Sequence, residues 1–327
     1  MKTPNPTLAR IYAPIDSQLQ RVVKVMTEEC RGLDPQIAPV VGDAVRLGGK
    51  LLRPALLLLS GQACGDLDER HVRAAAAIEL IHTATLVHDD AIDAAEQRRR
   101  GATVNSRWGT EISIMVGDLL FARALEVFAQ VATPREHQLL SAALREVCEG
   151  ELFQLLARRQ RRLDERTYYR IISRKSGALC SVTCAIGAAL SGEADGHLSA
   201  FGHFGRCFGI ALQITDDCLD ICGEEAVVGK TLGHDFLDGK LTLPLIYATR
   251  SPDPALQAQL DTLMANPTDG WRRRLADLLA RCGAFEYCEQ AARRYVRRGA
   301  ARLDFLGKSP ERASLLALAD FVVERES

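Results

Sequence analysis

The chain has 327 residues, of which 47% are hydrophobic and 25% are charged, a composition that is typical of a folded globular protein. Its 41 basic and 42 acidic residues give a formal net charge of -1, which argues against nucleic acid as a partner. The N-terminus lacks an apolar signal segment, and the longest apolar run, 51–60, is too short to cross a bilayer. We therefore expect a cytoplasmic protein without a transmembrane segment.

Apolar residues recur every three or four positions along most of the chain, the spacing of amphipathic α-helices. Glycine and proline clusters separate these stretches, and neither an alternating strand nor an Asn-Gly or Asp-Gly hairpin signal is convincing. The clearest helical stretches are 72–91, 112–131, 137–156, 168–190, 201–221 and 271–279. No linker or short repeat divides the chain, so the sequence predicts a single all-α domain over residues 1–327.

An acidic cluster ends the stretch 72–91 and consists of Asp89, Asp90 and Asp93. On a helix, Asp89 and Asp93 lie one turn apart, about 40° from each other around the axis. His82 lies two turns before Asp89 on the same face. One helix face could therefore present both carboxylates and an imidazole.

A second cluster with the same spacing, Asp216, Asp217 and Asp220, follows Gln213 near the end of another apolar stretch. Three carboxylates within five residues repel one another, so a plain solvent-exposed helix face explains two such clusters poorly. Mg²⁺ binds carboxylate oxygens and keeps its other positions for water and phosphate. Two facing sets of carboxylates could therefore hold metal ions around one diphosphate.

Several basic residues could bind the anions that such a site would hold. Lys50 and Arg53 stand at a helix start, after Gly48-Gly49 and beside Pro54, where free N–H groups favour an anion. The other candidates are Arg98, Arg99, Arg100, Lys175 with the following Ser176, Lys230 and Lys240. Together they supply the charge that two diphosphates need.

Three further basic runs, 158–166, 272–274 and 293–298, are interspersed with apolar or acidic residues. We interpret them as solvated helix faces.

In chain order, these motifs resemble the trans-isoprenyl diphosphate synthases, also called polyprenyl synthetases, from about Gly48 to Pro244. The combination is specific, although no single motif is. The matching segments are Gly48-Gly49-Lys50…Arg53-Pro54, the first aspartates with their arginines, Gly117-Asp118, Gly150-Glu151…Gln154-Leu155, Lys175-Ser176, Gln213…Asp216-Asp217…Asp220, and the glycine-lysine segments around Lys230 and Lys240.

The resemblance implies an isoprenoid-synthase-type helical barrel around a central cavity, usually in a homodimer. It implies that an allylic diphosphate, geranyl or farnesyl, is ionised and joined to isopentenyl diphosphate with three Mg²⁺ ions. Asp89, Asp93 and Asp216 would be the direct metal ligands, and the other three aspartates would support them.

The resemblance also assigns the basic residues to two substrates. One arginine, Lys175 and Lys240, with help from Lys230, would draw charge from the leaving diphosphate. A second arginine would hold isopentenyl diphosphate together with Lys50, Arg53 and His82. Ser176 and Gln213 are further candidate substrate-binding residues.

One departure from the family pattern concerns the arginines. The family usually places its Arg-Arg-Gly one residue closer to the first aspartates, whereas three arginines precede Gly101 here. Either Arg98/Arg99 or Arg99/Arg100 is therefore the functional pair.

The length of the product depends on the cavity below Asp89. One isoprene unit is about as long as one helical turn of roughly 5.4 Å, and Thr85 lies one turn before Asp89 with Ala84 beside it. In the family, an aromatic residue at these positions stops growth early, whereas both are small here. We expect a product of roughly 35 to 50 carbons, with octaprenyl as the best guess. Candidates for the cavity floor further along the chain are Met115, Phe121 and Phe128.

Three alternatives remain. A short-chain farnesyl or geranylgeranyl diphosphate synthase would share every catalytic motif. A terpene cyclase would be expected to carry an Asn/Ser/Glu-type second site in place of Asp216-Asp217-x-x-Asp220. A regulatory subunit would typically have lost its aspartate motifs, and this chain retains both.

Overall fold

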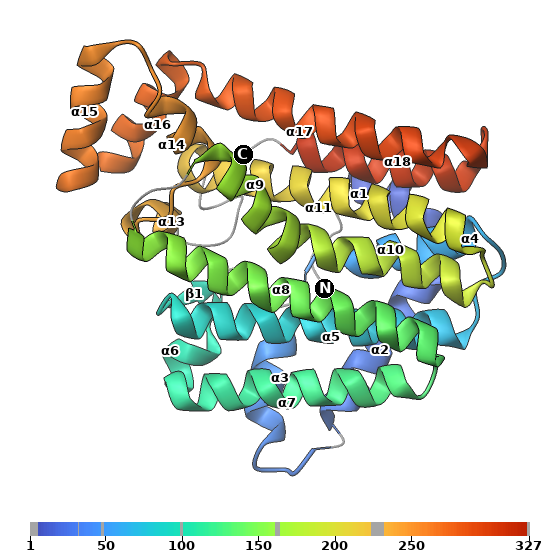
Figure 1. The fold of residues 1–327 in the computed structure, drawn as a ribbon. Coiled ribbons are helices and arrows are strands. Elements are labelled where there is room, and N and C mark those ends of the chain that lie inside the picture. The colour runs from blue at the N-terminus through green and yellow to red at the C-terminus, as the bar shows by residue number, and fades with distance from the viewer. Residues whose placement is uncertain are drawn as a thin grey trace.

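The computed structural model describes residues 6–31, 33–46, 49–98, 101–160, 164–223 and 232–325. These residues form an almost entirely helical protein, so the predicted all-α class is confirmed (Figure 1). The elements are α1 (Pro6–Tyr12), η1 (Ala13–Ile15), α2 (Asp16–Arg31), α3 (Ala38–Arg46), α4 (Leu52–Gln62), α5 (Glu69–Ile92), β1 (Gln97–Arg98), β2 (Gly101–Ala102), α6 (Val104–Trp108), α7 (Thr110–Ala129), α8 (Pro134–Gln160), α9 (Glu165–Ile172), η2 (Ser173–Gly177), α10 (Ala178–Leu190), α11 (Asp195–Cys222), α13 (His234–Leu237), α14 (Leu243–Ala248), α15 (Pro254–Ala265), α16 (Trp271–Arg281), α17 (Ala284–Ala300), η3 (Ala301–Leu306) and α18 (Pro310–Val323).

Helix α5 forms the centre of the molecule and packs against α2, α4 and α7. Its middle, from Val72 to Ile81, is buried on nearly every side, and Ala74–Ala77 allow the neighbouring helices to approach closely. Asp68 caps its first turn and accepts hydrogen bonds from the backbone N–H groups of Arg70 and His71. A rigid, buried helix therefore ends at the first acidic cluster.

Helix α11 runs beside α10 and α17, and α10 in turn packs against α4 and α8. Phe201, Phe204 and Phe208 of α11 are fully buried among these helices. The second acidic cluster lies in the last two turns of α11. Two buried helices thus deliver both clusters to the same part of the molecule.

The α13–α16 region has a smaller hydrophobic core of its own, which includes Leu245, Leu256, Leu260, Leu275 and Leu279. Figure 1 shows α15 and α16 at one end of the molecule, away from α7. The division of the chain into a single domain stays a prediction.

Two local features differ from the sequence-based expectation. A short antiparallel ladder pairs Gln97 with Ala102 and Arg98 with Gly101, directly after the first acidic cluster. The predicted helix 168–190 is α9 and α10 joined by the π-helical turn η2, which carries Lys175 and Ser176. Such turns often occur at functional sites because the wider turn redirects side chains.

No helix among the described residues is long and apolar enough to span a membrane.

A close approach between α10 and α4 depends on Gly187. A methyl group there would collide with the backbone carbonyl of Leu57, which no side-chain movement could relieve. We expect Gly187→Ala to lower the free energy of unfolding by about 1–3 kcal/mol, measured by urea denaturation. Gly196→Ala, at an exposed position with no atom within 4 Å, is the control and should be neutral. Equal stability of the two variants would contradict this account of the packing.

Candidate active site

The first acidic cluster pairs with two lysines that come from other elements. Lys175 of η2 lies 3.3 Å from Asp89 Oδ2 and 2.5 Å from Glu151 of α8. Lys240, between α13 and α14, lies 2.7 Å from Asp93 Oδ2 and 3.2 Å from Asp235. The site therefore combines α5, α8, η2 and the segment after α11.

Burial divides the six aspartates into two groups. The side chains of Asp89, Asp93 and Asp216 are 22%, 23% and 43% exposed. The residues Asp90, Asp217 and Asp220 are only 4%, 4% and 1% exposed. The three more exposed aspartates are those that the family resemblance names as direct metal ligands, and that role stays a prediction.

Each of the more exposed aspartates has a basic partner. Asp89 pairs with Lys175, and Asp93 pairs with Lys240. Asp216 pairs with Arg325, near the end of the chain, at 3.1 Å. Because these partners are cations, a metal–diphosphate complex could take their place or share the carboxylates with them.

The buried aspartates are held by groups inside the fold: an arginine for Asp90, and neutral donors for Asp217 and Asp220. Arg98 holds Asp90 with a bidentate contact at 2.6–2.9 Å. Asp220 accepts the backbone N–H groups of Gly233 and Asp235 at 3.1 and 3.3 Å. These carboxylates therefore fix the chain around the site.

Asp217 is the centre of a buried hydrogen-bond network. Tyr168 of α9 donates its hydroxyl to Oδ2 at 2.6 Å, and the Gln213 amide donates to Oδ1 at 2.8 Å. The Ser176 hydroxyl in turn donates to Oε1 of the Gln213 side chain at 2.6 Å. The network connects α9, η2 and α11, and so ties the turn that carries Lys175 to the helix that carries Asp216.

Burial and neighbouring charges shift the pKa values of Asp217, Lys175 and Lys240. Burial raises the pKa of Asp217 to about 7, helped by the charge of Asp235 and opposed by the Tyr168 and Gln213 hydrogen bonds. Burial alone would lower the pKa of Lys175, but Asp89 and Glu151 outweigh it and raise the value. For Lys240, Asp235 and Asp93 likewise raise the pKa against the effect of burial. Both lysines are therefore held in their charged form.

The contact with Asp90 bears on the choice between the two arginine pairs. Arg98 uses Nε and a terminal nitrogen on that carboxylate, and the pKa of Asp90 is nevertheless raised by burial, with Arg98 opposing the rise. Arg98 is thus engaged inside the fold. The other two arginines, Arg99 and Arg100, lie outside the described residues, as do Gly48 and Lys230.

Two of the predicted isopentenyl diphosphate residues, Lys50 and Arg53, lie at the start of α4, and His82 lies on α5. Pro54 lies in its first turn as predicted, and Leu51 caps the helix in a left-handed conformation with φ of 52°. Tyr12 donates its hydroxyl to the backbone carbonyl of Lys50 at 2.7 Å, and the Lys50 ammonium lies 5.7 Å from the Phe321 ring. Arg53 and His82 are half-buried. The backbone around Lys50 is therefore fixed by α1 and α18.

Two glycine-acid motifs have steric explanations. A Cβ at Gly150 would lie 2.8 Å from the backbone nitrogen of Lys175, so glycine allows α8 to approach η2 and Glu151 to reach that lysine. A Cβ at Gly117 would collide with His88, whose Nε2 lies 3.3 Å from Asp118. The first motif thus supports the site directly, and the second fixes α7 against α5.

The predicted chain-length residues lie in different surroundings. Ala84 is fully buried, and the half-buried Thr85 donates its hydroxyl to the His82 carbonyl at 2.8 Å. Phe128 is fully buried against His137, and Phe121 is half-buried. Met115 is 63% exposed, so it does not line a cavity inside a single chain.

Sequence reasoning missed several contributors. Arg158 lies 3.8 Å from Asp93 and 3.3 Å from Asp238, although its basic run was interpreted as a solvated face. Neither Tyr168 nor Arg325 was singled out as a site residue from the sequence. The periodicity of α9, which puts Tyr168 seven residues before Lys175, was the available clue for the tyrosine.

The donor set fits Mg²⁺. No three His, Cys, Asp or Glu side chains in the described ranges converge into a preformed metal cage. Mg²⁺ does not need one, because it commonly binds one or two carboxylates and takes its other ligands from water and phosphate. Asp89, Asp93 and Asp216 would be the residues that hold it.

Comparison with known proteins agrees with the fold and the motifs. The family model described as polyprenyl synthetase matches residues 34–276. The chain is 32% identical over 316 residues to heptaprenyl diphosphate synthase component 2 of Bacillus subtilis, covering 96% of this chain and 90% of the relative. It is 31% identical over 322 residues to octaprenyl diphosphate synthase of Escherichia coli, covering 94% and 99%.

Among solved structures, polyprenyl synthase from Caulobacter crescentus, complexed with calcium and isoprenyl diphosphate, superposes with a TM-score of 0.93 at 30% identity over the full length of both chains. The helical architecture and the match over most of the sequence define a prenyltransferase of the isoprenoid-synthase fold. This chain therefore belongs to the polyprenyl synthetase family and is a trans-prenyl diphosphate synthase.

The hydrogen bond from Tyr168 to Asp217 can be tested by removing one atom. Tyr168→Phe leaves a buried carboxylate with one donor fewer, so we expect a loss of about 1–3 kcal/mol in the free energy of unfolding. Tyr169→Phe is the matched control, because Tyr169 makes ring contacts with Tyr168 and Tyr295 and no hydrogen bond to Asp217. Urea denaturation of both variants measures the effect, and an equal loss in both would argue against a specific bond.

Proposed function

We propose that this enzyme condenses isopentenyl diphosphate onto geranyl or farnesyl diphosphate and makes a long all-trans polyprenyl diphosphate, with octaprenyl as the best single candidate. The observation that carries the proposal is that Asp89, Asp93 and Asp216 are the three more exposed carboxylates of the two clusters, each paired with a cation: Lys175, Lys240 and Arg325. The same site would serve a short-chain synthase, so the reaction and the product length are argued separately.

The side chains divide the work of the reaction. Asp89, Asp93 and Asp216 would hold three Mg²⁺ ions, which when bound neutralise charge on the leaving diphosphate. Lys175 and Lys240 add fixed positive charge at the same place, at no cost in reorganisation.

The second substrate would be held from the other side of the site. Lys50, Arg53 and His82, with one of the arginines after β1, would orient isopentenyl diphosphate so that its double bond attacks the allylic carbon. The released diphosphate then accepts the proton. The apolar helices around the site exclude water from the cationic intermediate.

The role of Asp89 has a direct kinetic test. Asp89→Ala removes one proposed metal ligand and one partner of Lys175, and we expect a loss on the order of a thousandfold in kcat. Glu96→Ala, which removes an exposed carboxylate on the other side of Asp93, should leave kcat unchanged. Turnover is measured with farnesyl diphosphate, labelled isopentenyl diphosphate and Mg²⁺. Near-normal turnover by Asp89→Ala would remove this residue from the site.

The length of the product is a separate proposal. The relatives range in name from geranylgeranyl to nonaprenyl diphosphate synthases, so family membership alone does not decide the product length. The argument for a long product is that Thr85 and Ala84, one turn before Asp89, are small and leave the tail a path along α5. Phe128, buried beside the same helix, stays a candidate for the end of that path.

Thr85→Phe should shorten the product, because an aromatic ring one turn from Asp89 would close the cavity after few additions. Thr83→Phe, about 200° away around α5, is the control and should not shorten it. Products are sized by chromatography after hydrolysis of the diphosphate. A wild-type product of fifteen or twenty carbons would refute the long-chain proposal, and an unchanged length in Thr85→Phe would mean that the tail runs elsewhere.

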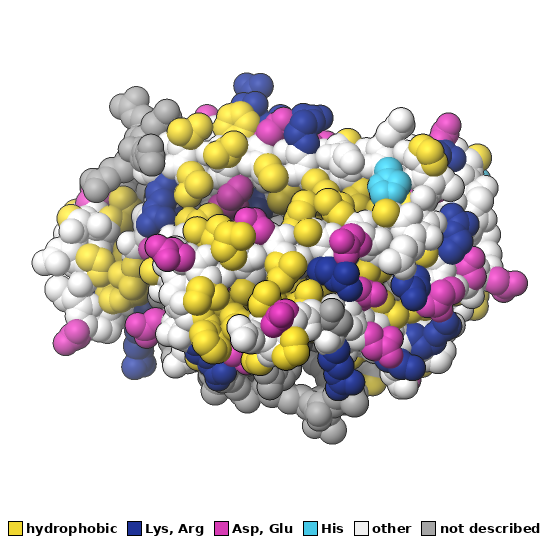
Figure 2. Space-filling view, turned by 90° about the horizontal axis from the view of Figure 1, so that it is seen from below, with side chains coloured by type: hydrophobic (Ala, Val, Ile, Leu, Met, Phe, Trp, Pro, Cys, Tyr) yellow, Lys and Arg dark blue, Asp and Glu magenta, His cyan; other side chains and the backbone are white. Residues whose placement is uncertain are grey.

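The assembly also stays a proposal. Large apolar side chains are more than a third exposed on α7 and α8, including Ile114, Met115, Leu152 and Leu156. Figure 2 views the molecule from the α7 side and shows hydrophobic side chains gathered on this face. We expect a homodimer to cover them. The Bacillus relative is named as one component of its synthase, so a different partner subunit is the alternative, and sedimentation of the chain alone distinguishes the two. A cytoplasmic location likewise stays a prediction.

A further inference from the structure

A second cavity lies behind the wall that carries Lys175. It has a volume of about 400 Å³ and is bounded by α9, η2, α11 and α17. On one face of α9 and η2, Tyr168 and Lys175 line the active-site cavity, whereas Tyr169, Arg170 and Ser173 on the other face line this second cavity. The two cavities therefore share one wall.

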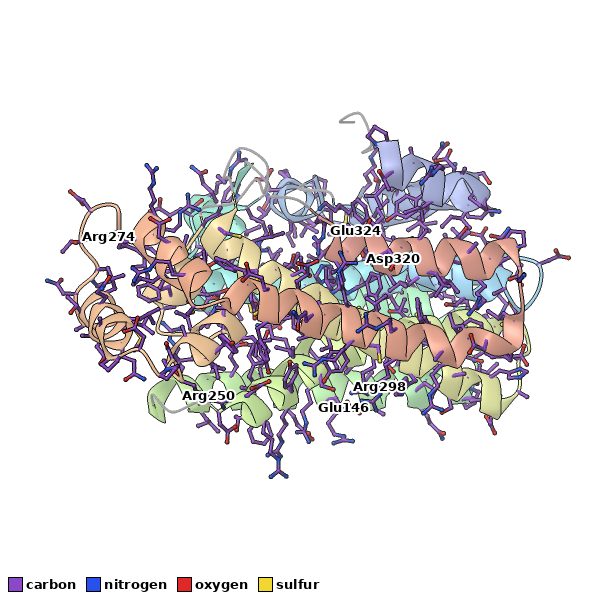
Figure 3. The ribbon with its side chains drawn as sticks, turned by 90° about the horizontal axis from the view of Figure 1, so that it is seen from above. Glu146, Arg250, Arg274, Arg298, Asp320 and Glu324 are labelled. Carbon is purple, nitrogen blue, oxygen red and sulfur yellow. The ribbon has the colours of Figure 1, made fainter. Side chains whose placement is uncertain are left out.

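Four arginines from three helices converge on the second cavity: Arg166 and Arg170 of α9, Arg206 of α11 and Arg298 of α17. Arg166 and Arg298 belong to two basic runs that are far apart in the sequence and were interpreted as separate solvated faces. Figure 3 shows Arg298 on α17 on the same side of the molecule as Glu146 of α8. The fold thus concentrates positive charge at one place.

Few carboxylates compensate this charge. Arg206 pairs with Glu146 at 2.9 Å and also reaches Ser173. Arg170 stacks on the Phe153 ring at 4.2 Å. Within the described residues, no carboxylate forms an ion pair with Arg166, Arg170 or Arg298. These three arginines are exposed, so water and salt screen their mutual repulsion, and an anion bound between them would reduce the repulsion further.

His203 also lines the cavity and lies in the positive potential of the arginines. The Nε2 atom of His203 is buried and has no hydrogen-bond partner among the described residues. Burial lowers the pKa of this ring, and the charges of Arg298, Arg302 and Arg206 lower it further. The ring is therefore neutral at physiological pH, and it offers a polar atom to a ligand.

The floor of the cavity has a different character from its rim. Cys207 and Ile210 are buried there, and the rings of Tyr169 and Tyr295 lie 5.6 Å apart in a tilted pair. The volume falls within the range of small-molecule sites, which combine apolar walls with a few convergent polar groups. A charged rim over an apolar and aromatic floor fits a ligand with an anionic head and an organic tail.

We propose that this cavity is a binding site for an organic diphosphate, with the diphosphate between Arg166, Arg170 and Arg298 and the organic part over Tyr169, Tyr295 and Ile210. Arginine is suited to this role because its planar guanidinium makes paired hydrogen bonds with phosphate oxygens. An occupant would press on η2 from the side opposite Lys175. The site does not depend on the reaction proposed above, because binding can be measured without turnover.

The test is calorimetric titration with geranyl S-thiolodiphosphate, an unreactive probe, in the presence of EDTA. The double variant Arg166→Gln/Arg298→Gln should bind one equivalent fewer than the wild type, or bind it about tenfold more weakly for each arginine removed. The control Arg281→Gln/Arg297→Gln makes the same change in net charge at exposed positions that do not line the cavity, and it should keep the wild-type stoichiometry. A thermal melt of each variant verifies folding, and single Arg298→Gln replaces the double variant if that fails to fold.

Two results would overturn the proposal. Equal binding by all three proteins would mean that the cavity takes no diphosphate, and an equal loss in both double variants would reduce the effect to overall charge. Titration with inorganic diphosphate tests whether the floor of the cavity contributes to binding, because this probe has no organic part. The prenyl probe should bind more tightly at the arginine-dependent site, and equal affinity would refute the role assigned to Tyr169, Tyr295 and Ile210.

Discussion

The repulsion between two sets of aspartates is the constraint on which the rest of this structure depends. Asp89, Asp90 and Asp93 end one buried helix, and Asp216, Asp217 and Asp220 end another. Without counter-ions, such charges would push α5 and α11 apart. The fold provides two kinds of partner: buried donors, among them the Arg98 guanidinium, hold Asp90, Asp217 and Asp220 in place, and lysine or arginine side chains pair with the three more exposed aspartates. This division prepares three carboxylates to exchange a protein cation for a metal ion.

The supporting contacts explain why residues far from the reacting atoms matter. Gly150 lets α8 approach η2, so that Glu151 shares Lys175 with Asp89. Tyr168 and Gln213 hold Asp217, and the π-helical turn between α9 and α10 redirects Lys175 into the site. A change in any of these would move a charge by a fraction of a turn, and electrostatic catalysis is sensitive to such displacements because the groups must be preorganised.

Most of the helices and part of the site could be predicted from the sequence, because they depend on local periodicity. The helices and the spacing of Asp89 and Asp93 follow from 3.6 residues per turn. Asp216 and Asp220 have the same spacing but differ in exposure, so the packing around α11 sets that difference. Pro54 marks the first turn of α4 because proline lacks the N–H group that a helix interior would need. The chain order of the motifs also indicates the family.

The remaining features arise from contacts between distant segments. Arg325 reaches Asp216 across more than a hundred residues, and Arg158 reaches Asp93 from a run that looks like a solvated face. The bidentate contact between Arg98 and Asp90 depends on the short β1–β2 turn, which carries no strand pattern. Helical periodicity also could not show that Met115 points outward, since it gives a relative direction and not the position of the neighbours.

The central claim is that the two acidic clusters together hold metal ions around one diphosphate. Electron paramagnetic resonance of Mn²⁺, titrated with inorganic diphosphate present, tests this most directly. The account predicts tight Mn²⁺ binding that requires diphosphate and that is weakened by Asp89→Asn and by Asp216→Asn alike. Mn²⁺ binding that survives both substitutions, or that depends on one acidic cluster alone, would contradict this account.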